Sequence, residues 1–171
     1  LLYVGARHGY KNFGALLRAY SASAQLKMEF SIVCFGGGKL AAREVKIVAE
    51  LGLPSNCITQ LDGEDSTLSG LYAAAAALVY PSLYEGFGIP PLEAMALDCP
   101  VVCSNTSSMP EVVGNAAEFF DPTNIDDMRA AIERVVLSSV HGANLVSRGK
   151  ERVKQFSWEK CAQDTFSVYQ K

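Results

Sequence analysis

The stretch "ALVYPSLYEGFGIPPLEAMALDCPVVCS", residues 77–104, begins and ends with a short apolar run and has a loop rich in glycine and proline between them. The two runs, residues 77–81 and 100–104, are continuous rather than alternating, which is typical of strands covered on both faces of a sheet. Pro90 and Pro91 favour the first turn of a helix between the runs, which would place Glu93 about one turn into that helix. Strand, helix and strand in this order predict two parallel strands joined by a crossover connection.

The same alternation continues along the rest of the chain. Four further apolar runs are expected strands: residues 1–4, 30–35, 57–61 and 117–120. Apolar residues recur at helical spacing in four other segments: Phe13, Leu16, Leu17 and Tyr20; Val45, Val48 and Leu51; Leu68, Leu71 and Tyr72; Ile125, Met128, Ile132, Val135 and Val136. Helices are also expected near residues 142–155 and 158–170, with Trp158 and Tyr169 as packing residues. The sequence therefore predicts an α/β fold, a doubly wound, Rossmann-like parallel sheet of about six strands with helices on both faces.

The composition is that of one ordinary domain. The chain has 171 residues, of which 49% are hydrophobic, and we expect residues 1–171 to form a single unit. The net charge of -3, from 15 basic and 18 acidic residues, gives no field that would attract nucleic acid. No apolar run approaches the roughly 20 residues of a membrane span, so we expect a soluble, cytoplasmic domain.

Two features of the chain bear on its context. The first residues already resemble a strand, without an initiator Met or a basic leader, so we expect a piece of a longer protein. The five cysteines are odd in number, form no CxxC pair and mostly lie in apolar runs: Cys34, Cys57, Cys99, Cys103 and Cys161. This pattern favours buried free thiols in a reducing compartment.

The glycine triplet of "CFGGGKLAA", residues 34–42, follows an expected strand and opens a helix, where backbone N–H groups can hold a phosphate. A Walker loop is excluded, because Val33 and Leu40 stand where it needs a glycine and a hydroxyl residue. A looser dinucleotide fingerprint is satisfied by Gly36, Gly38, Ala41 and Asp62. A tight strand-to-helix turn would explain the glycines as well, so both interpretations stay open.

Two other loops offer charged groups at the same edge of the predicted sheet. Arg7 and Lys11 follow the first strand, and together they suit a diphosphate, although two solvated charges would look the same. Glu85 precedes the glycines of residues 81–97, whereas Glu93 lies in the helix that follows them. Because one is expected in the loop and the other about one turn into the helix, they cannot be a close acid pair. We expect them to accept hydrogen bonds from hydroxyls at two ends of one ligand, with phosphates between. For a single Glu in a first helical turn, a favourable dipole interaction is the alternative.

Residues 80–122, from "YPSLYEGFGIPPLE" to "PEVVGNAAEFFDP", strongly resemble the C-terminal, donor-binding half of GT-B retaining glycosyltransferases of family four, also called glycosyl transferases group 1. The resemblance covers essentially the whole chain. "YVGARHGYKNF" (3–13) is similar to the family's diphosphate-binding segment, and "IVCFGGGK" (32–39) to its second glycine-rich turn. Many members carry the first cation nearer to the glycine, so Lys11 matches the family's pattern better than Arg7 does.

The resemblance implies roles for individual residues. As catalytic groups it implies Arg7 and Lys11, which would bind and neutralise the donor diphosphate, and Glu85, which would contact hydroxyls of the transferred sugar. As donor-binding groups it implies the backbone amides of Phe87, Gly88 and Ile89, and Glu93, which would bind the ribose. Gly37 would form the floor of the pocket, and Leu61 and Asp62 would face the nucleobase. No DxD metal signature accompanies them, and we expect no metal ion. The sequence "DGED" (62–65) is expected to be a polar turn that caps the next helix through Asp65 or Ser66.

The resemblance also implies an activity and partners. We expect transfer of a hexose, with mannose favoured, from a GDP- or UDP-linked donor to a hydroxyl of a saccharide or lipid-linked acceptor, without a cofactor. The N-terminal acceptor-binding domain of the same polypeptide would be absent from this chain, and this chain would be inactive alone. The absent domain could attach the protein to the inner membrane face. An NAD(P)-binding Rossmann domain of an oxidoreductase and a non-catalytic nucleotide-binding module are the alternatives.

Overall fold

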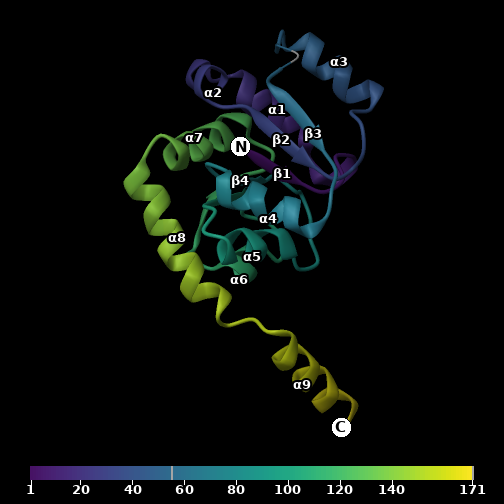
Figure 1. The fold of residues 1–171 in the computed structure, drawn as a ribbon, viewed down its shortest axis with the longest axis vertical. Coiled ribbons are helices and arrows are strands. Elements are labelled where there is room, and N and C mark those ends of the chain that lie inside the picture. Colours follow the sequence, from purple (N-terminus) through teal and green to yellow (C-terminus); the bar gives the residue numbers. More distant parts are fainter. Residues whose placement is uncertain (55, 171) are drawn as a thin grey trace.

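Six short strands form one parallel sheet in residues 1–54 and 56–170, the part of the chain that the computed structural model describes (Figure 1). The strands are β1 (Leu2–Val4), β2 (Ile32–Phe35), β3 (Ile58–Leu61), β4 (Leu78–Tyr80), β5 (Val101–Ser104) and β6 (Ala117–Phe120). Each lies within an apolar run for which the sequence predicts a strand, and this confirms the predicted doubly wound α/β sheet.

The strand order is β3-β2-β1-β4-β5-β6, so the chain order reverses between β1 and β4. Leu2 of β1 is aligned with Val33 of β2 on one side and with Leu78 of β4 on the other. All strands are parallel, so their carboxyl ends lie at one edge of the sheet. Ligands of such sheets bind where the order reverses, which directs attention to the loops after β1 and β4.

The helices connect consecutive strands and then extend the chain beyond the sheet. They are a 3-10 turn η1 (Gly9–Lys11), α1 (Phe13–Ser21), α2 (Ala24–Glu29), α3 (Ala42–Glu50), α4 (Asp65–Ala74), α5 (Ile89–Ala96), α6 (Met109–Val113), α7 (Ile125–Val136), α8 (Ser139–Val153) and α9 (Trp158–Tyr169). The short helices α2 and α6 were not predicted from the sequence; in α2 the Ser23 hydroxyl caps the first turn by accepting from the Leu26 N–H.

Side chains of the strands alternate between two buried cores, one on each face of the sheet. Tyr3 and Val79 belong to the core covered by α1, α2 and α7. Leu2 and Leu78, their neighbours in sequence, belong to the core covered by α4, α5 and α6. The apolar runs are therefore continuous because both faces of the strands are buried.

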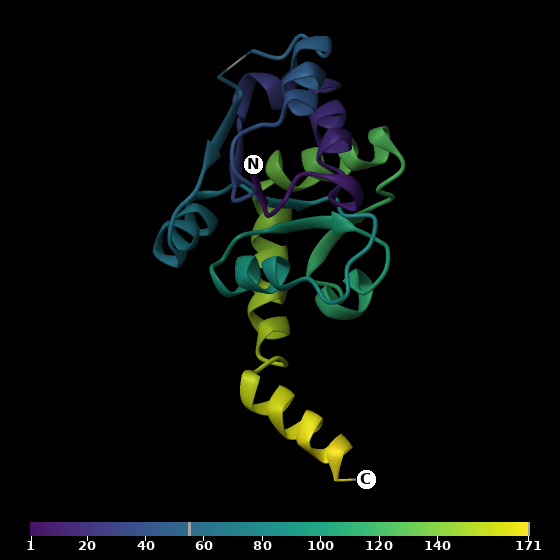
Figure 2. The same ribbon diagram turned by 90° about the vertical axis from the view of Figure 1, so that its right-hand side faces the viewer.

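Two helices differ from expectation. In α3 the predicted stripe is only partly right: Val48 and Leu51 pack against the core, but Val45 is 52% exposed and no residue from Ala42 to Glu50 is fully buried. The prediction that Trp158 and Tyr169 are packing residues is wrong for the described part of the chain, where they are 78% and 85% exposed. Figures 1 and 2 show the reason: α9 extends away from the sheet and its covering helices.

The thiols agree with the sequence analysis for four of the five cysteines. Cys34, Cys57, Cys99 and Cys103 are buried and free, whereas Cys161 on α9 is exposed and free. Among the described residues, no helix combines the length and the apolar character needed to cross a bilayer.

Candidate functional site

The predicted site residues come together at the carboxyl edge of the sheet. Arg7 and Lys11 follow β1, Gly37 follows β2, Leu61 ends β3 and Asp62 follows it, and Glu85, Phe87 and Gly88 follow β4, with Ile89 and Glu93 in α5. The four strands β3, β2, β1 and β4 are neighbours in the sheet, and the strand order reverses between β1 and β4.

Lys11 and Glu85 form an ion pair across this reversal. The Nζ atom of Lys11 lies 2.6 Å from Oε1 of Glu85, and the two side chains are only 18% and 11% exposed. Nζ also lies 3.4 Å from the Tyr80 hydroxyl, at the end of β4. Burial, and then the Glu85 charge, raises the pKa of Tyr80, so this hydroxyl stays protonated. The pair thus places one cation and one carboxylate where a polar ligand of the sheet would bind.

The backbone that carries Lys11 is fixed from three sides. The Tyr3 hydroxyl donates to the carbonyl of Ala6 at 2.5 Å. The side-chain amide of Asn12 donates to the carbonyls of Pro81 and Pro122, at 3.1 and 2.9 Å. Asn12 itself has a φ of 58°, a conformation that asparagine adopts more readily than most residues. The position of Lys11 is therefore set by loops that follow β4 and β6 as well as by its own loop.

The loop after β4 is held by side-chain hydroxyl groups of the loop after β5. Ser107 and Ser108 both donate to the carbonyl of Glu85, and Ser108 also donates to that of Phe87 at 3.2 Å. Thr106 donates to the carbonyl of Leu83 at 3.1 Å. These three hydroxyls were not predicted as part of the site, and their position just after a strand was the only signal.

The Phe87 carbonyl accepts from Ser108, so the N–H of Gly88, in the same planar peptide unit, points away from the β5 loop. Within residues 1–54 and 56–170, the N–H groups of Phe87, Gly88 and Ile89 donate to no protein acceptor. Gly88 precedes α5 with a φ of 88°, and Pro90 and Pro91 occupy the first turn as predicted. The loop and the helix N-terminus together can receive an anion.

Glu93 lies one turn into α5, and its partner is a buried tyrosine. The Tyr72 hydroxyl, on α4, donates to Oε2 of Glu93 at 2.9 Å, and the Tyr72 residue is only 1% exposed. Burial and the neighbouring Glu93 raise the pKa of Tyr72 far above its ordinary value, so the hydroxyl remains a donor. One carboxylate oxygen is thereby fixed, which orients the other. Tyr72 was expected only as a core residue, and its hydroxyl is the part that the periodicity did not reveal.

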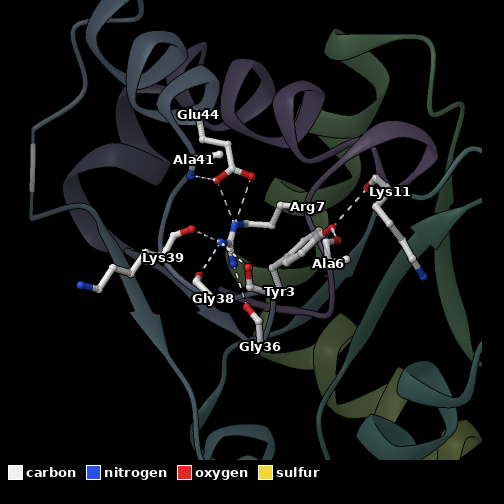
Figure 3. Close-up of polar contacts among 10 residues, drawn as sticks. Tyr3, Ala6, Arg7, Lys11, Gly36, Gly38, Lys39, Ala41 and Glu44 are labelled. Atoms are coloured by element: carbon white, nitrogen blue, oxygen red, sulfur yellow. Dashed lines mark hydrogen bonds and ion pairs between the residues drawn. The ribbon is translucent and has the colours of Figure 1, made fainter.

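Arg7 does not point toward Lys11, and the expected convergence of these two cations is absent from the structure (Figure 3). Its guanidinium donates to the carbonyls of Gly36, Gly37, Gly38 and Lys39 and to the carboxylate of Glu44. The Arg7 side chain is only 2% exposed. Direct contact between Arg7 and a diphosphate stays a prediction. The geometry does not favour it, because the guanidinium N–H groups donate to protein oxygens.

The remaining predicted residues lie on the β2 and β3 side of the site. The Gly36 N–H donates to the carbonyl of Leu61 at 3.0 Å, so the glycine turn is joined to the end of β3. Asp62 is exposed, and its carboxylate accepts from the Gln60 amide at 2.8 Å. The prediction that Asp65 or Ser66 caps α4 is wrong, because Glu64 holds the capping position and its side chain makes no capping bond. In the described ranges, no cluster of three or more His, Cys, Asp or Glu side chains could hold a metal ion.

Residues 1–152 match the protein family described as "Glycosyl transferases group 1". The chain belongs to this family. It is 38% identical over 170 residues to O-antigen chain mannosyltransferase B of Escherichia coli, covering 98% of this chain and 45% of that protein. It is 38% identical over 130 residues to MMP alpha-(1->4)-mannosyltransferase of Mycolicibacterium hassiacum, covering 74% of this chain and 32% of that protein.

A solved structure agrees with the family assignment. Sucrose-phosphate synthase of Thermosynechococcus elongatus superposes with a TM-score of 0.83 at 26% identity, covering 99% of this chain and 44% of that protein. This group 1 glycosyl transferase chain therefore has the fold of half of a GT-B enzyme and spans less than half the length of each of these three proteins.

Proposed function

We propose that this chain is the donor-binding half of a retaining glycosyltransferase that takes a hexose from a nucleoside diphosphate sugar. The observation that supports it best is the Lys11–Glu85 pair beside the N–H groups of Phe87, Gly88 and Ile89. A cation, a carboxylate and several N–H groups at the reversal of strand order suit a ligand that carries both phosphates and hydroxyls.

In this proposal the diphosphate is the leaving group. The bond between the anomeric carbon and the diphosphate oxygen breaks, the sugar passes to an acceptor hydroxyl with retained configuration, and negative charge develops on the phosphate. Lys11 and the N–H groups before α5 stabilise that charge without a metal ion. One well-placed donor of this kind is worth about 3 kcal/mol in the transition state.

The two glutamates bind the two ends of the donor. Glu85 accepts hydrogen bonds from hydroxyls of the sugar, and Glu93, held by Tyr72, accepts them from the ribose. Gly37, Leu61 and Asp62 then face the nucleobase at the β2 and β3 end. Mannose linked to GDP is the favoured donor, since two relatives at 38% identity are named mannosyltransferases.

The dinucleotide alternative has less support. Its glycine fingerprint normally occupies the first strand-to-helix turn at the reversal of strand order. Here the turn at Gly36 and Gly38 follows β2, one strand away from the reversal, and its carbonyls are turned inward toward Arg7. The dinucleotide hypothesis also leaves Glu85 and Glu93 without a role. A non-catalytic binding module would keep the binding roles of both glutamates and would lack only turnover.

The whole enzyme would need more chain than residues 1–171. An N-terminal half would bind a saccharide or lipid-linked acceptor and close the site, and it could hold a cytoplasmic protein at the inner membrane face. The partial coverage of both mannosyltransferase relatives supports this division of labour. We therefore expect donor binding without appreciable transfer from this chain alone.

Calorimetric titration with GDP, UDP, GDP-mannose, UDP-glucose and NAD tests the proposal. We expect selective binding of one nucleoside diphosphate, weakened at least tenfold by Glu93→Ala and unchanged by Glu159→Ala, a matched change on exposed α9. Binding of NAD alone, insensitive to Glu93, would contradict the proposal in favour of the dinucleotide hypothesis. Absence of any nucleotide binding would show that residues 1–171 do not hold a complete donor site.

A further inference from the structure

The turn after β2 has an unusual backbone. Gly36, Gly37 and Gly38 have φ angles of 79°, 74° and 68°, so three consecutive residues are left-handed. Glycine tolerates this conformation but is also the residue that loses most conformational freedom when it is held there. Their carbonyls gather on one side, where mutual repulsion would open the turn unless a donor lies between them.

Arg7 supplies those donors. Nη1 donates to the Gly36 carbonyl at 2.8 Å, and Nη2 lies 3.2, 2.5 and 3.0 Å from the carbonyls of Gly37, Gly38 and Lys39. A planar guanidinium with five N–H groups can serve several acceptors at once, whereas an ammonium is a compact point charge.

Glu44 completes the arrangement from the first turn of α3. Its carboxylate oxygens lie 3.2 and 3.3 Å from Nε of Arg7, and Oε2 also accepts from the Ala41 N–H at 2.7 Å. The side chains of Arg7 and Glu44 are 2% and 12% exposed, so the buried charge of each is balanced by the other. The same carboxylate thus fixes the guanidinium and the start of the helix that follows the turn.

The turn also packs closely against the first loop. A Cβ atom on Gly37 would lie 2.9 Å from the Gly5 carbonyl oxygen and 3.1 Å from Nη1 of Arg7. The β1 loop, which carries Lys11, and the β2 turn, which faces the proposed nucleobase site, are therefore one packed unit with Arg7 at its centre (Figure 3).

We infer that Arg7 and Glu44 are positioning residues that hold the Gly36–Gly38 turn in the conformation a nucleotide donor requires, with Arg7 contacting the protein and not the phosphates. This inference rests on the proposed function, because it assigns the turn to the nucleoside side of the same site. It gives Arg7 a role different from that of Lys11, although the two follow the same strand.

The first test needs no nucleotide. NMR order parameters of the Gly37 and Gly38 amides are measured in the unaltered chain and in Arg7→Gln, Arg7→Lys, Glu44→Ala and Arg18→Gln, where Arg18 is an exposed arginine of α1. We expect values near 0.85 in the unaltered chain and in Arg18→Gln, and values below about 0.6 in the three other variants. Gly37 and Gly38 as rigid in Arg7→Gln and Glu44→Ala as in the unaltered chain would overturn the inference. Glu44→Ala changes no residue of the β1 loop and serves where Arg7→Gln does not fold.

The second test separates positioning from direct phosphate contact. GDP and GMP are titrated into the same chains by calorimetry. Positioning predicts that Arg7→Gln and Arg7→Lys weaken both ligands by the same factor, about tenfold, leaving the ratio of the two Kd values unchanged. Loss of GDP affinity alone, rescued by Arg7→Lys, would overturn the inference in favour of direct contact, and unchanged affinity for both ligands would overturn it as well.

The two tests also separate this inference from the proposed function. If the unaltered chain binds neither nucleotide, the proposed function fails for residues 1–171, and the order parameters alone decide whether Arg7 and Glu44 hold the turn. If GDP binds and the glycines stay rigid in the variants, the proposed function stands and the positioning role fails.

Discussion

Lys11 and Glu85 are separated by 74 residues in sequence, yet the Nζ of one lies 2.6 Å from an Oε1 of the other. Their loops follow β1 and β4, the neighbouring strands at which the chain order reverses. The two loops are further joined by the Leu83 N–H, which donates to the Tyr10 carbonyl at 2.7 Å. The pair is therefore part of the fold before any ligand arrives, and a ligand that binds Lys11 must share it with Glu85.

Breaking this pair from one side should destabilise the domain. Lys11→Met or Glu85→Gln leaves a mostly buried charge without its partner, and we expect each to lower the free energy of unfolding by about 1–3 kcal/mol. The double variant should cost less than the sum by at least about 0.5 kcal/mol. Urea unfolding of the four chains measures the coupling, and strictly additive costs would refute it.

The matched control is an exposed pair on α3. Lys46 and Glu50 lie 3.8 Å apart with side chains 78% and 54% exposed. Because water screens such a pair, Lys46→Met should change the free energy of unfolding by less than about 0.5 kcal/mol.

The hydroxyl of Tyr72 should matter for binding more than for folding. Tyr72→Phe keeps the buried ring but frees Glu93, and we expect nucleoside diphosphate affinity to fall about fivefold. The control is Tyr20→Phe, which removes another buried hydroxyl, one that donates to the Phe30 carbonyl at 2.7 Å before β2 begins. That change should lower stability by about 1 kcal/mol and leave affinity unaltered. Equal affinity losses in both variants, measured by calorimetry, would mean that Glu93 is not oriented by Tyr72.

Features fixed by local chemistry could be predicted from the sequence. Continuous apolar runs gave the strands because both faces of each strand are buried, and Pro90 and Pro91 gave the start of α5 because their rings fix φ near the helical value. The position of Glu93 in the helix follows from that start. The loops that carry Lys11, Gly37 and Glu85 were also predictable, because parallel strands bring their carboxyl ends to one edge.

Features set by distant partners could not be predicted. Arg7 turns inward because Glu44, 37 residues away, and the carbonyls of the β2 turn are there to receive it. Trp158 and Tyr169 have helical spacing, but spacing does not say whether another surface covers the helix, and none of the described elements does so. In the same way, Tyr72 has the periodicity of a core residue, and only the packing of α4 beside α5 shows that its hydroxyl meets Glu93.

The two glycines of the β4 loop should respond differently to alanine. Gly88 has a φ of 88°, and an added Cβ would collide with the methyl group of Met109, whereas nothing lies within 4 Å of a Cβ added to Gly86. We expect Gly88→Ala to lower the free energy of unfolding by about 1–3 kcal/mol and Gly86→Ala by less than about 0.5 kcal/mol. Thermal unfolding provides the comparison; similar losses in the two variants would show that backbone conformation at Gly88 is not the constraint.

Buried thiols should make the domain sensitive to alkaline pH. Burial raises the pKa of Cys99 from 9.0 to about 11, and burial likewise raises the pKa of Cys34 to about 12. Above pH 9 the unfolded chain releases these protons while the folded chain keeps them, so the free energy of unfolding falls as pH rises. The stabilisation is complete below pH 9 and is lost as pH rises toward 11 and 12, at up to about 1.4 kcal/mol per pH unit for each thiol.

Comparison with variants isolates the thiols from other groups that titrate in the same range. Urea unfolding between pH 8 and pH 10.5 should show a shallower decline for Cys99→Ala than for the unaltered chain. Cys161→Ser, a change at the exposed thiol of α9, is the matched control. If Cys99→Ala kept the full slope, ionisation of Cys99 would not be the cause of the alkaline loss, and Cys34, Tyr3 and Tyr80, whose pKa values burial also raises, would become the leading explanation.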